Sequence, residues 1–114
     1  MDSKELAFKI ADIILQKKGS NIVVMDLRNL TTVTDFFVVC SVISDTQVKA
    51  ITDFIREETK KLDERAWHNE GYSSLSWVLL DFVNVVVHVF LEDTRKFYNL
   101  EGLWADAVVT EVKD

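Results

Sequence analysis

The sequence of 114 residues contains no proline and only three glycines, and no stretch is rich in glycine, serine or proline. Such stretches are the usual linkers between domains, so their absence leaves no point at which to divide the chain. No internal repeat is visible either. A chain of this length can bury roughly 65% of its unfolded surface, which is enough for one hydrophobic core. We therefore expect a single domain over residues 1–114.

Cys40 is the only cysteine, so the chain cannot form an internal disulfide, and no Cys/His spacing typical of a zinc site occurs. Because Cys40 lies in an apolar segment, we interpret it as a buried, inert thiol rather than a nucleophile. Charges interrupt the apolar runs within residues 1–10, which argues against a signal peptide, and no run approaches the ~20 apolar residues of a membrane span. These absences favour a soluble cytoplasmic protein without a membrane partner.

Basic residues are fewer than acidic ones, 13 against 19, which gives a formal net charge of −6. This balance argues against nonspecific binding to a phosphate backbone, and we expect no strong direct binding of nucleic acid. A local basic patch remains compatible with it. A basic protein would suit this chain as a partner, because opposite charges speed the encounter.

The periodicity of the apolar residues predicts an α/β (α+β) fold with a mixed sheet. Apolar stripes at helical spacing indicate helices over residues 2–18 and 45–63, which we expect to pack on the same face of the sheet, leaving the other face less covered. Strands are predicted over residues 21–27, 36–41, 66–70, 77–82, 85–90 and 107–112, and short helical pieces over 94–104.

Both long helices have recognisable starts in the sequence. Asp2 with Glu5, and Ser44 with Gln47, have the spacing of a capping box at a helix N-terminus. Gly19 follows two lysines and is expected to end the first helix.

The stretch from Trp77 to Phe90, WVLLDFVNVVVHVF, is the most apolar part of the chain, yet it contains an aspartate and a histidine. If residues 83 and 84 form a two-residue turn, the alternation of side chains produces one entirely apolar face and one mixed face. Val83 is unfavourable in such a turn, which requires positive φ. The mixed face carries Trp77, Leu79, Asp81, Val86, His88 and Phe90.

Large aromatic side chains beside a few polar groups are typical of a protein-binding surface. The alternative is a second core layer in which His88 is hydrogen-bonded to Asp81 or to the backbone, since buried histidines usually have a partner. The pattern alone leaves both interpretations open.

The motifs of the C-terminal third resemble those of the ribosomal silencing factor family, also called the RsfS or Iojap family. They read W-V-x-x-D, V-V-H-V-F and R-x-x-Y-x-L-E-x-L-W, beginning at Trp77, Val86 and Arg95. Upstream, the matching positions are Asp26, Leu27, Thr34 to Val39, Ser44, Gln47, Glu70 and Gly71. The chain departs from the family at Val42, Ile43 and Val83, close to positions where members commonly carry glycine.

The resemblance implies a factor that is not an enzyme and needs no cofactor. Such a factor binds the large ribosomal subunit through its large-subunit protein fourteen, sterically blocks subunit joining and represses translation when nutrients are scarce. The resemblance also implies a nucleotidyltransferase-like fold and a possible homodimer. By position, the expected partner-binding residues are Trp77, Leu79, Asp81, His88, Phe90, Arg95 and Tyr98. Arg95, Glu101 and Trp104 are alternatively expected to hold the C-terminal tail in place.

Two other functions are weighed against this one. A nucleotidyltransferase needs a Gly-Ser phosphate loop and two or three carboxylates that hold Mg²⁺. Here Gly19 and Ser20 precede the first strand, and Asp26 has no acidic residue two positions away. An acid–base pair of Asp81 with His88 would lack an accompanying nucleophile or metal set. The third possibility is a dimeric interaction module whose apolar sheet face forms its own interface.

Overall fold

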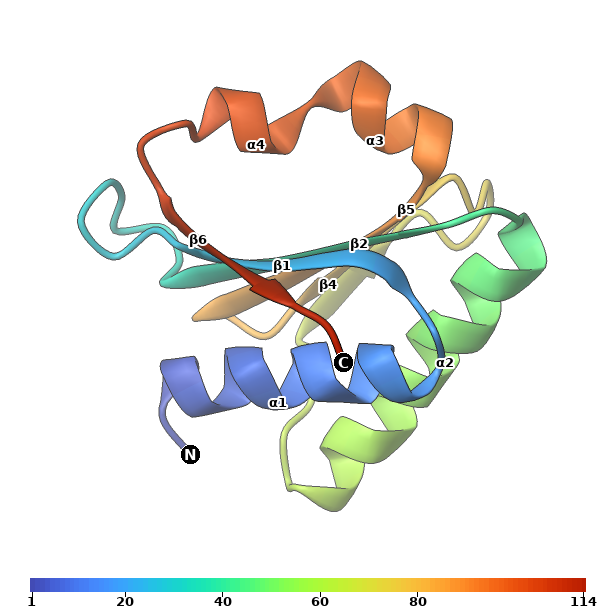
Figure 1. Cartoon of the computed structure of the whole chain (residues 1–114). Coiled ribbons are helices and arrows are strands. Elements are labelled where there is room, and N and C mark those ends of the chain that lie inside the picture. Colours follow the sequence, from blue (N-terminus) through green and yellow to red (C-terminus); the bar gives the residue numbers. More distant parts are fainter.

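The computed structural model describes residues 1–114 and shows a mixed six-stranded sheet with helices on both faces (Figure 1). The strand order across the sheet is β3-β4-β5-β2-β1-β6. In chain order the elements are α1 (Ser3–Gln16), β1 (Ser20–Asp26), β2 (Phe36–Val42), α2 (Asp45–Lys61), β3 (His68–Glu70), β4 (Trp77–Asp81), β5 (Val85–Leu91), α3 (Glu92–Tyr98), α4 (Leu100–Leu103) and β6 (Val108–Val112). None of the helices has the length and apolarity needed to cross a membrane.

The central strands β2 and β5 run parallel, and every other pair of neighbouring strands is antiparallel. The predicted mixed sheet and its six strands are therefore confirmed, and β2 is internal as its continuous apolar run suggested. The strand predicted over residues 66–70 is shorter, because β3 pairs only through His68–Glu70 at the sheet edge.

The two long helices cover one face of the sheet, as predicted (Figure 1). Their isoleucines Ile10, Ile14, Ile51 and Ile55 are buried in one cluster of 21 residues with the strand residues that point toward them, such as Val38. The opposite face lies under the short helices α3 and α4 and has a smaller cluster of six buried residues. This face has less cover, as the sequence suggested.

Both predicted helix starts are confirmed, since the carboxylate of Asp2 accepts a hydrogen bond from the backbone N–H of Glu5 at 2.8 Å. The Ser44 hydroxyl likewise accepts from the N–H of Gln47 at 3.2 Å. The predicted end of α1 is wrong by one residue. Lys18 and not Gly19 has the left-handed backbone, with φ of 62°, and the Gly19 N–H closes the helix end on Ile14.

The hairpin between β4 and β5 has the predicted two-residue turn. The Phe82 N–H donates to the Val85 carbonyl at 2.8 Å, and Trp77 pairs with Phe90. Val83 has a φ of 76°, and the Asn84 N–H bonds back to the Phe82 carbonyl at 3.0 Å. This is a γ-turn of the rare, strained type, placed on a β-branched residue.

Candidate protein-binding face

The face of the sheet beneath α3 and α4 is only partly covered. Cross-strand pairs place Leu79, Asp81 and Val86 of β4 and β5 on this face, beside His68 and Glu70 of β3. The first three are partly exposed, and the two residues of β3 are exposed. We call these five residues the open face. It combines an apolar centre with one carboxylate at each end.

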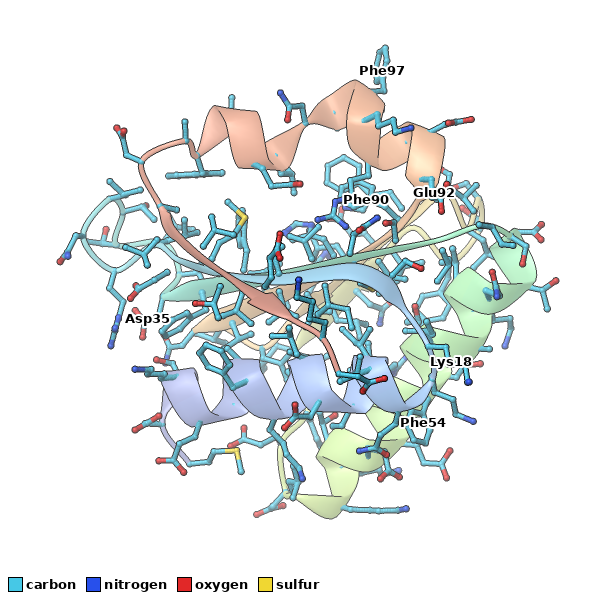
Figure 2. The ribbon with its side chains drawn as sticks, in the orientation of Figure 1. Lys18, Asp35, Phe54, Phe90, Glu92 and Phe97 are labelled. Atoms are coloured by element: carbon cyan, nitrogen blue, oxygen red, sulfur yellow. The ribbon has the colours of Figure 1, made fainter.

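Next to the open face lies a layer of stacked aromatic rings. The Trp77 ring stacks on Phe90 with 4.8 Å between centroids, and the Tyr98 ring lies 4.7 Å from Trp77. Phe90 is completely buried, between the sheet and α3 (Figure 2). Trp77 is partly exposed, and Tyr98 is 51% exposed. The layer therefore has a buried floor and an accessible rim.

His88 belongs to the buried floor, because only 3% of its surface is exposed. Its Nδ1 accepts a hydrogen bond of 3.0 Å from the Trp77 indole N–H, so the neutral ring carries its proton on Nε2. That Nε2 atom is buried without a hydrogen-bond partner, and the Phe37 ring lies edge-on at 4.6 Å. Burial lowers the pKa of His88 to about 3, which keeps the imidazole uncharged.

The expected hydrogen bond from His88 to Asp81 or to the backbone is wrong. Asp81 accepts instead from the backbone N–H of Val83 at 2.7 Å and thereby supports the strained turn. Leu79, not Asp81, lies directly opposite His88 in the ladder. An acid–base pair of Asp81 with His88 is therefore not formed.

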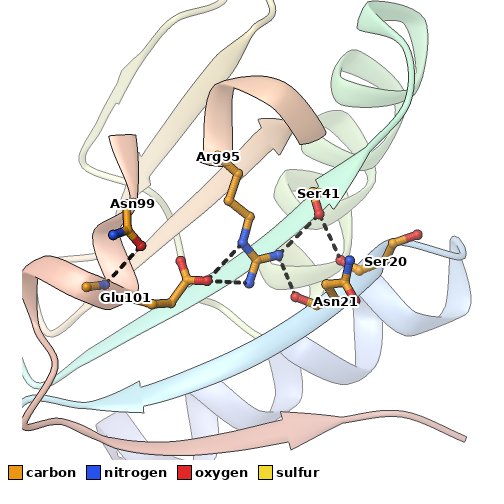
Figure 3. A network of polar contacts seen from close by, with 7 residues as sticks. Ser20, Asn21, Ser41, Arg95, Asn99 and Glu101 are labelled. Carbon is orange, nitrogen blue, oxygen red and sulfur yellow. Dashed lines mark hydrogen bonds and ion pairs between the residues drawn. The ribbon is translucent and has the colours of Figure 1, made fainter. Parts of the chain in front are cut away.

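Arg95 fastens the two short helices to the sheet (Figure 3). Its Nη1 donates to the Asn21 carbonyl at 2.6 Å and to the Ser41 hydroxyl at 3.2 Å. Its Nε and Nη2 donate to one carboxylate oxygen of Glu101 at 3.2 and 3.1 Å. The side chain is nearly buried, so the expected tail-holding role of Arg95 and Glu101 is confirmed.

Trp104 closes the far end of the covered region. Its ring meets Phe37 edge-on at 6.0 Å, and both residues pack against the smaller buried cluster. Trp104 thus also holds the tail, as expected.

The structure separates the predicted partner-binding residues into two groups. Trp77, Leu79, Asp81 and Tyr98 reach the surface, whereas His88, Phe90 and Arg95 lie beneath it. Contact with a partner remains a prediction for the whole set, and burial limits the second group to supporting that contact from below.

Phe97 is an exposed aromatic residue that the sequence argument missed. It is 81% exposed, meets Tyr98 edge-on at 5.1 Å and points away from α3 (Figure 2). Its position directly before the motif tyrosine was the only signal, and periodicity over so short a helix does not separate an outward ring from a core ring.

The profile of the family described as "Ribosomal silencing factor during starvation" matches residues 1–114. The chain belongs to the ribosomal silencing factor family. Ribosomal silencing factor RsfS of Bacillus subtilis is 35% identical over 112 residues, which cover 98% of this chain and 95% of that protein. The chloroplastic protein Iojap of Zea mays is 34% identical over 106 residues, covering 93% of this chain and 46% of that protein.

Solved structures agree with the membership in the ribosomal silencing factor family. A crystal structure of a protein from Chromobacterium violaceum has a TM-score of 0.89 and 31% identity, covering 92% of this chain and 88% of the other. One from Bacillus halodurans has a TM-score of 0.77 and 34% identity, covering 96% of both chains. The predicted α/β fold class is thus confirmed.

The parts of a nucleotidyltransferase site are not brought together in this family member. Gly19 and Ser20 lie at one end of β1 and Asp26 at the other, about 20 Å apart for a strand of this length. The Asp26 carboxylate binds the Arg28 guanidinium at 2.7 Å, which lowers the pKa of Asp26. No three His, Cys, Asp or Glu side chains are grouped so that they could hold a metal ion.

Cys40 is fully buried in the main core. Burial raises the pKa of its thiol to about 12, so the thiolate that a nucleophile requires is not formed near neutral pH. The interpretation of Cys40 as an inert core residue is confirmed.

Proposed function

We propose that this protein represses translation by binding the large ribosomal subunit through its large-subunit protein fourteen and blocking subunit joining. The observation that carries the proposal is the open face, bordered by Trp77 and Tyr98, in a chain that belongs to the ribosomal silencing factor family. An apolar centre with aromatic anchors at its border is the arrangement of a specific protein interface.

The rigidity of the aromatic layer supports this use of the surface. Trp77 is held by stacking on Phe90 and by its hydrogen bond to His88, so its rotamer is fixed before any partner arrives. A side chain that is already ordered loses less conformational entropy on binding. The buried residues of the layer therefore contribute by holding the exposed ones in place.

The charge of the open face favours a basic partner. Asp81 and Glu70 are carboxylates on or beside the apolar centre, and the whole chain has a formal net charge of −6. A positively charged protein surface would be attracted to this face and would meet it faster than a neutral one.

Steric exclusion requires only bulk at the right place. The chain measures 35 × 33 × 29 Å, which is large enough to keep two surfaces apart when it is bound between them. Repression of this kind uses no catalytic group and no cofactor, and it would take place in the cytoplasm.

The test is sedimentation of the purified protein with isolated large subunits, followed by addition of small subunits. We expect co-sedimentation and loss of subunit joining, and we expect Leu79→Glu to abolish both by placing a charge in the centre of the open face. Val33→Glu is the matched control, because Val33 is 83% exposed in the connection between β1 and β2. Unchanged binding by a folded Leu79→Glu variant would remove the open face from the site.

A second copy of this chain is the other candidate for the open face. Light scattering of the free protein would detect such a homodimer, and Leu79→Glu should then also dissociate it. If large subunits convert the dimer to bound monomers, the two partners use the same face. A dimer that persists in the bound state would place self-association elsewhere on the molecule.

A further inference from the structure

A hollow lined by three cationic side chains lies on the α2 side of the sheet, away from the open face. Arg56 and Lys60 from α2 and Arg65 from the connection to β3 line it, together with Glu57 and Ala66, and its volume is about 310 Å³. Such a concentration of positive charge contrasts with the formal net charge of −6 of the chain.

None of these three cations forms an ion pair, whereas Lys49 and Lys61 of the same helix are paired with Asp53 and Glu58 at 2.7 and 2.6 Å. Lysines near the end of α2 suit the negative pole of its dipole. That preference does not account for Arg65, which lies beyond the helix. The hollow therefore holds positive charge that no carboxylate of the chain neutralises by direct contact.

The hollow adjoins a second one of about 410 Å³, and both are lined by Arg65 and Ala66. Trp67 lines the second hollow and is 83% exposed. Its backbone is fixed, since its N–H donates to the Asp81 carbonyl at 2.8 Å. Asp63 and Glu64 also line this second hollow, so the positive charge is concentrated on the side of Arg56 and Lys60.

We infer that Arg56, Lys60 and Arg65, with Trp67 beside them, form a contact site for single-stranded RNA. Cationic side chains hold the phosphates of such a strand, and an exposed aromatic ring provides a platform on which a base stacks. A single free phosphate would leave the indole unused. The site needs no enclosed pocket, because the strand is held along a surface.

This inference rests on the proposed function and extends it, because a ribosomal subunit presents RNA beside its proteins. Trp67 directly precedes His68 of the open face, so the RNA site and the open face lie on opposite sides of the β3 edge. A subunit that holds the open face through a protein could present a strand of RNA around this edge. The contact would add affinity and fix the orientation of the bound protein.

The test is fluorescence anisotropy of a labelled ten-nucleotide single-stranded RNA with the full chain at about 50 mM salt. Because an acidic protein repels phosphates, we expect weak binding, with log affinity falling against log salt with a slope of about −2 for three phosphate contacts. The triple variant Arg56→Gln, Lys60→Gln, Arg65→Gln should weaken binding at least tenfold. Trp67→Ala should weaken it several-fold and leave the salt slope unchanged.

The matched control is Lys4→Gln, Lys9→Gln, Lys96→Gln, which removes three unpaired cations elsewhere and changes the net charge equally. We expect a loss of less than threefold from it. An equal loss in both triple variants, or no binding of RNA by the unaltered chain at 100 µM, would overturn the inference. Competition by inorganic phosphate at micromolar concentration would also overturn it, since it would indicate a site for a free anion.

The two proposals fail separately. Leu79→Glu should abolish binding to large subunits and leave binding of the free RNA unchanged, whereas the triple variant of the hollow should lose the RNA and only weaken subunit binding. Failure of Leu79→Glu to affect subunit binding would count against the proposed function alone.

Discussion

The two faces of the sheet use different kinds of side chain for different purposes. The face under α1 and α2 is aliphatic, and its buried cluster contains isoleucine, valine and leucine sealed by two long helices. The face under α3 and α4 combines stacked aromatic rings, a buried imidazole and an ion pair, and it remains partly open. The first face supplies most of the stability, and the second presents an ordered surface at the expense of complete burial.

The largest expected difference between the faces concerns two adjacent residues of β4. Leu80 is completely buried against the helices, whereas Leu79 is partly exposed on the open face. Leu80→Ala should lower the free energy of unfolding by about 3 kcal/mol, because it leaves a cavity in a packed core. Leu79→Ala should lower it by about 1 kcal/mol.

Urea unfolding of the two alanine variants measures this difference. If Leu79→Ala were as costly as Leu80→Ala, the open face would be a second core and its assignment as a binding surface would be wrong. A separate measurement of subunit binding should show the reverse order, with the larger loss for Leu79→Ala.

The next largest effect should come from the clamp that fastens α3 and α4. Arg95→Ala removes four hydrogen bonds to Asn21, Ser41 and Glu101. We expect a loss of about 2 kcal/mol rather than the larger cost of a fully buried pair, since Glu101 stays partly in contact with water. Hydrogen exchange should increase over residues 92–104 and not in α1. Uniform loss of protection would show that the two faces unfold together.

The sequence predicted the strands and the register of the β4–β5 hairpin, because alternation fixes which side chains share a face. It could not decide the partner of His88. Trp77 and Asp81 are both diagonal neighbours of His88, each two residues from Leu79, so the pattern treats them alike. The Val83 turn decides between them, because it takes the Asp81 carboxylate as its acceptor.

The clamp was recognised only in part, for a different reason. The motif positions suggested that Arg95 and Glu101 hold the tail, but the Asn21 carbonyl that Arg95 contacts lies 74 residues away. Contacts of that range depend on the assembled sheet and leave no local pattern. The left-handed residue at the end of α1 was also missed, because Lys18 has no intrinsic preference for that conformation.

His88 should make the stability of the aromatic face depend on pH. Its pKa is lowered to about 3 by burial in the folded chain, against an ordinary value of 6.5. Below pH 6.5 the unfolded chain therefore binds a proton that the folded chain does not, and the free energy of unfolding falls with pH. Between pH 6.5 and 5 this group alone should cost about 2 kcal/mol.

Unfolding by urea at a series of pH values measures this dependence. His88→Gln should remove the decrease between pH 6.5 and 5, whereas His68→Gln, at the exposed histidine of β3, should keep it. The same decrease in all three proteins would assign it to other groups and would show that the imidazole is not held in its neutral form.

The smallest expected effect distinguishes the strained end of the open face from the ordinary loops. Val83 has a φ of 76°, which is costly for a β-branched side chain, and it is 51% exposed, so little packing is lost when it is shortened. Val83→Gly should therefore raise the free energy of unfolding by about 1 kcal/mol, as the relief of strain exceeds the entropy cost of glycine. Val33→Gly, at an exposed residue whose φ is not positive, should lower it by a few tenths of a kcal/mol. Urea unfolding compares the two variants with the unaltered chain. If Val83→Gly also weakens binding to large subunits, the strained turn orients Asp81 for the partner, and the chain retains valine at a cost in stability. If binding is unchanged while stability rises, the strain belongs to the turn alone, and the open face is ordered by its aromatic neighbours.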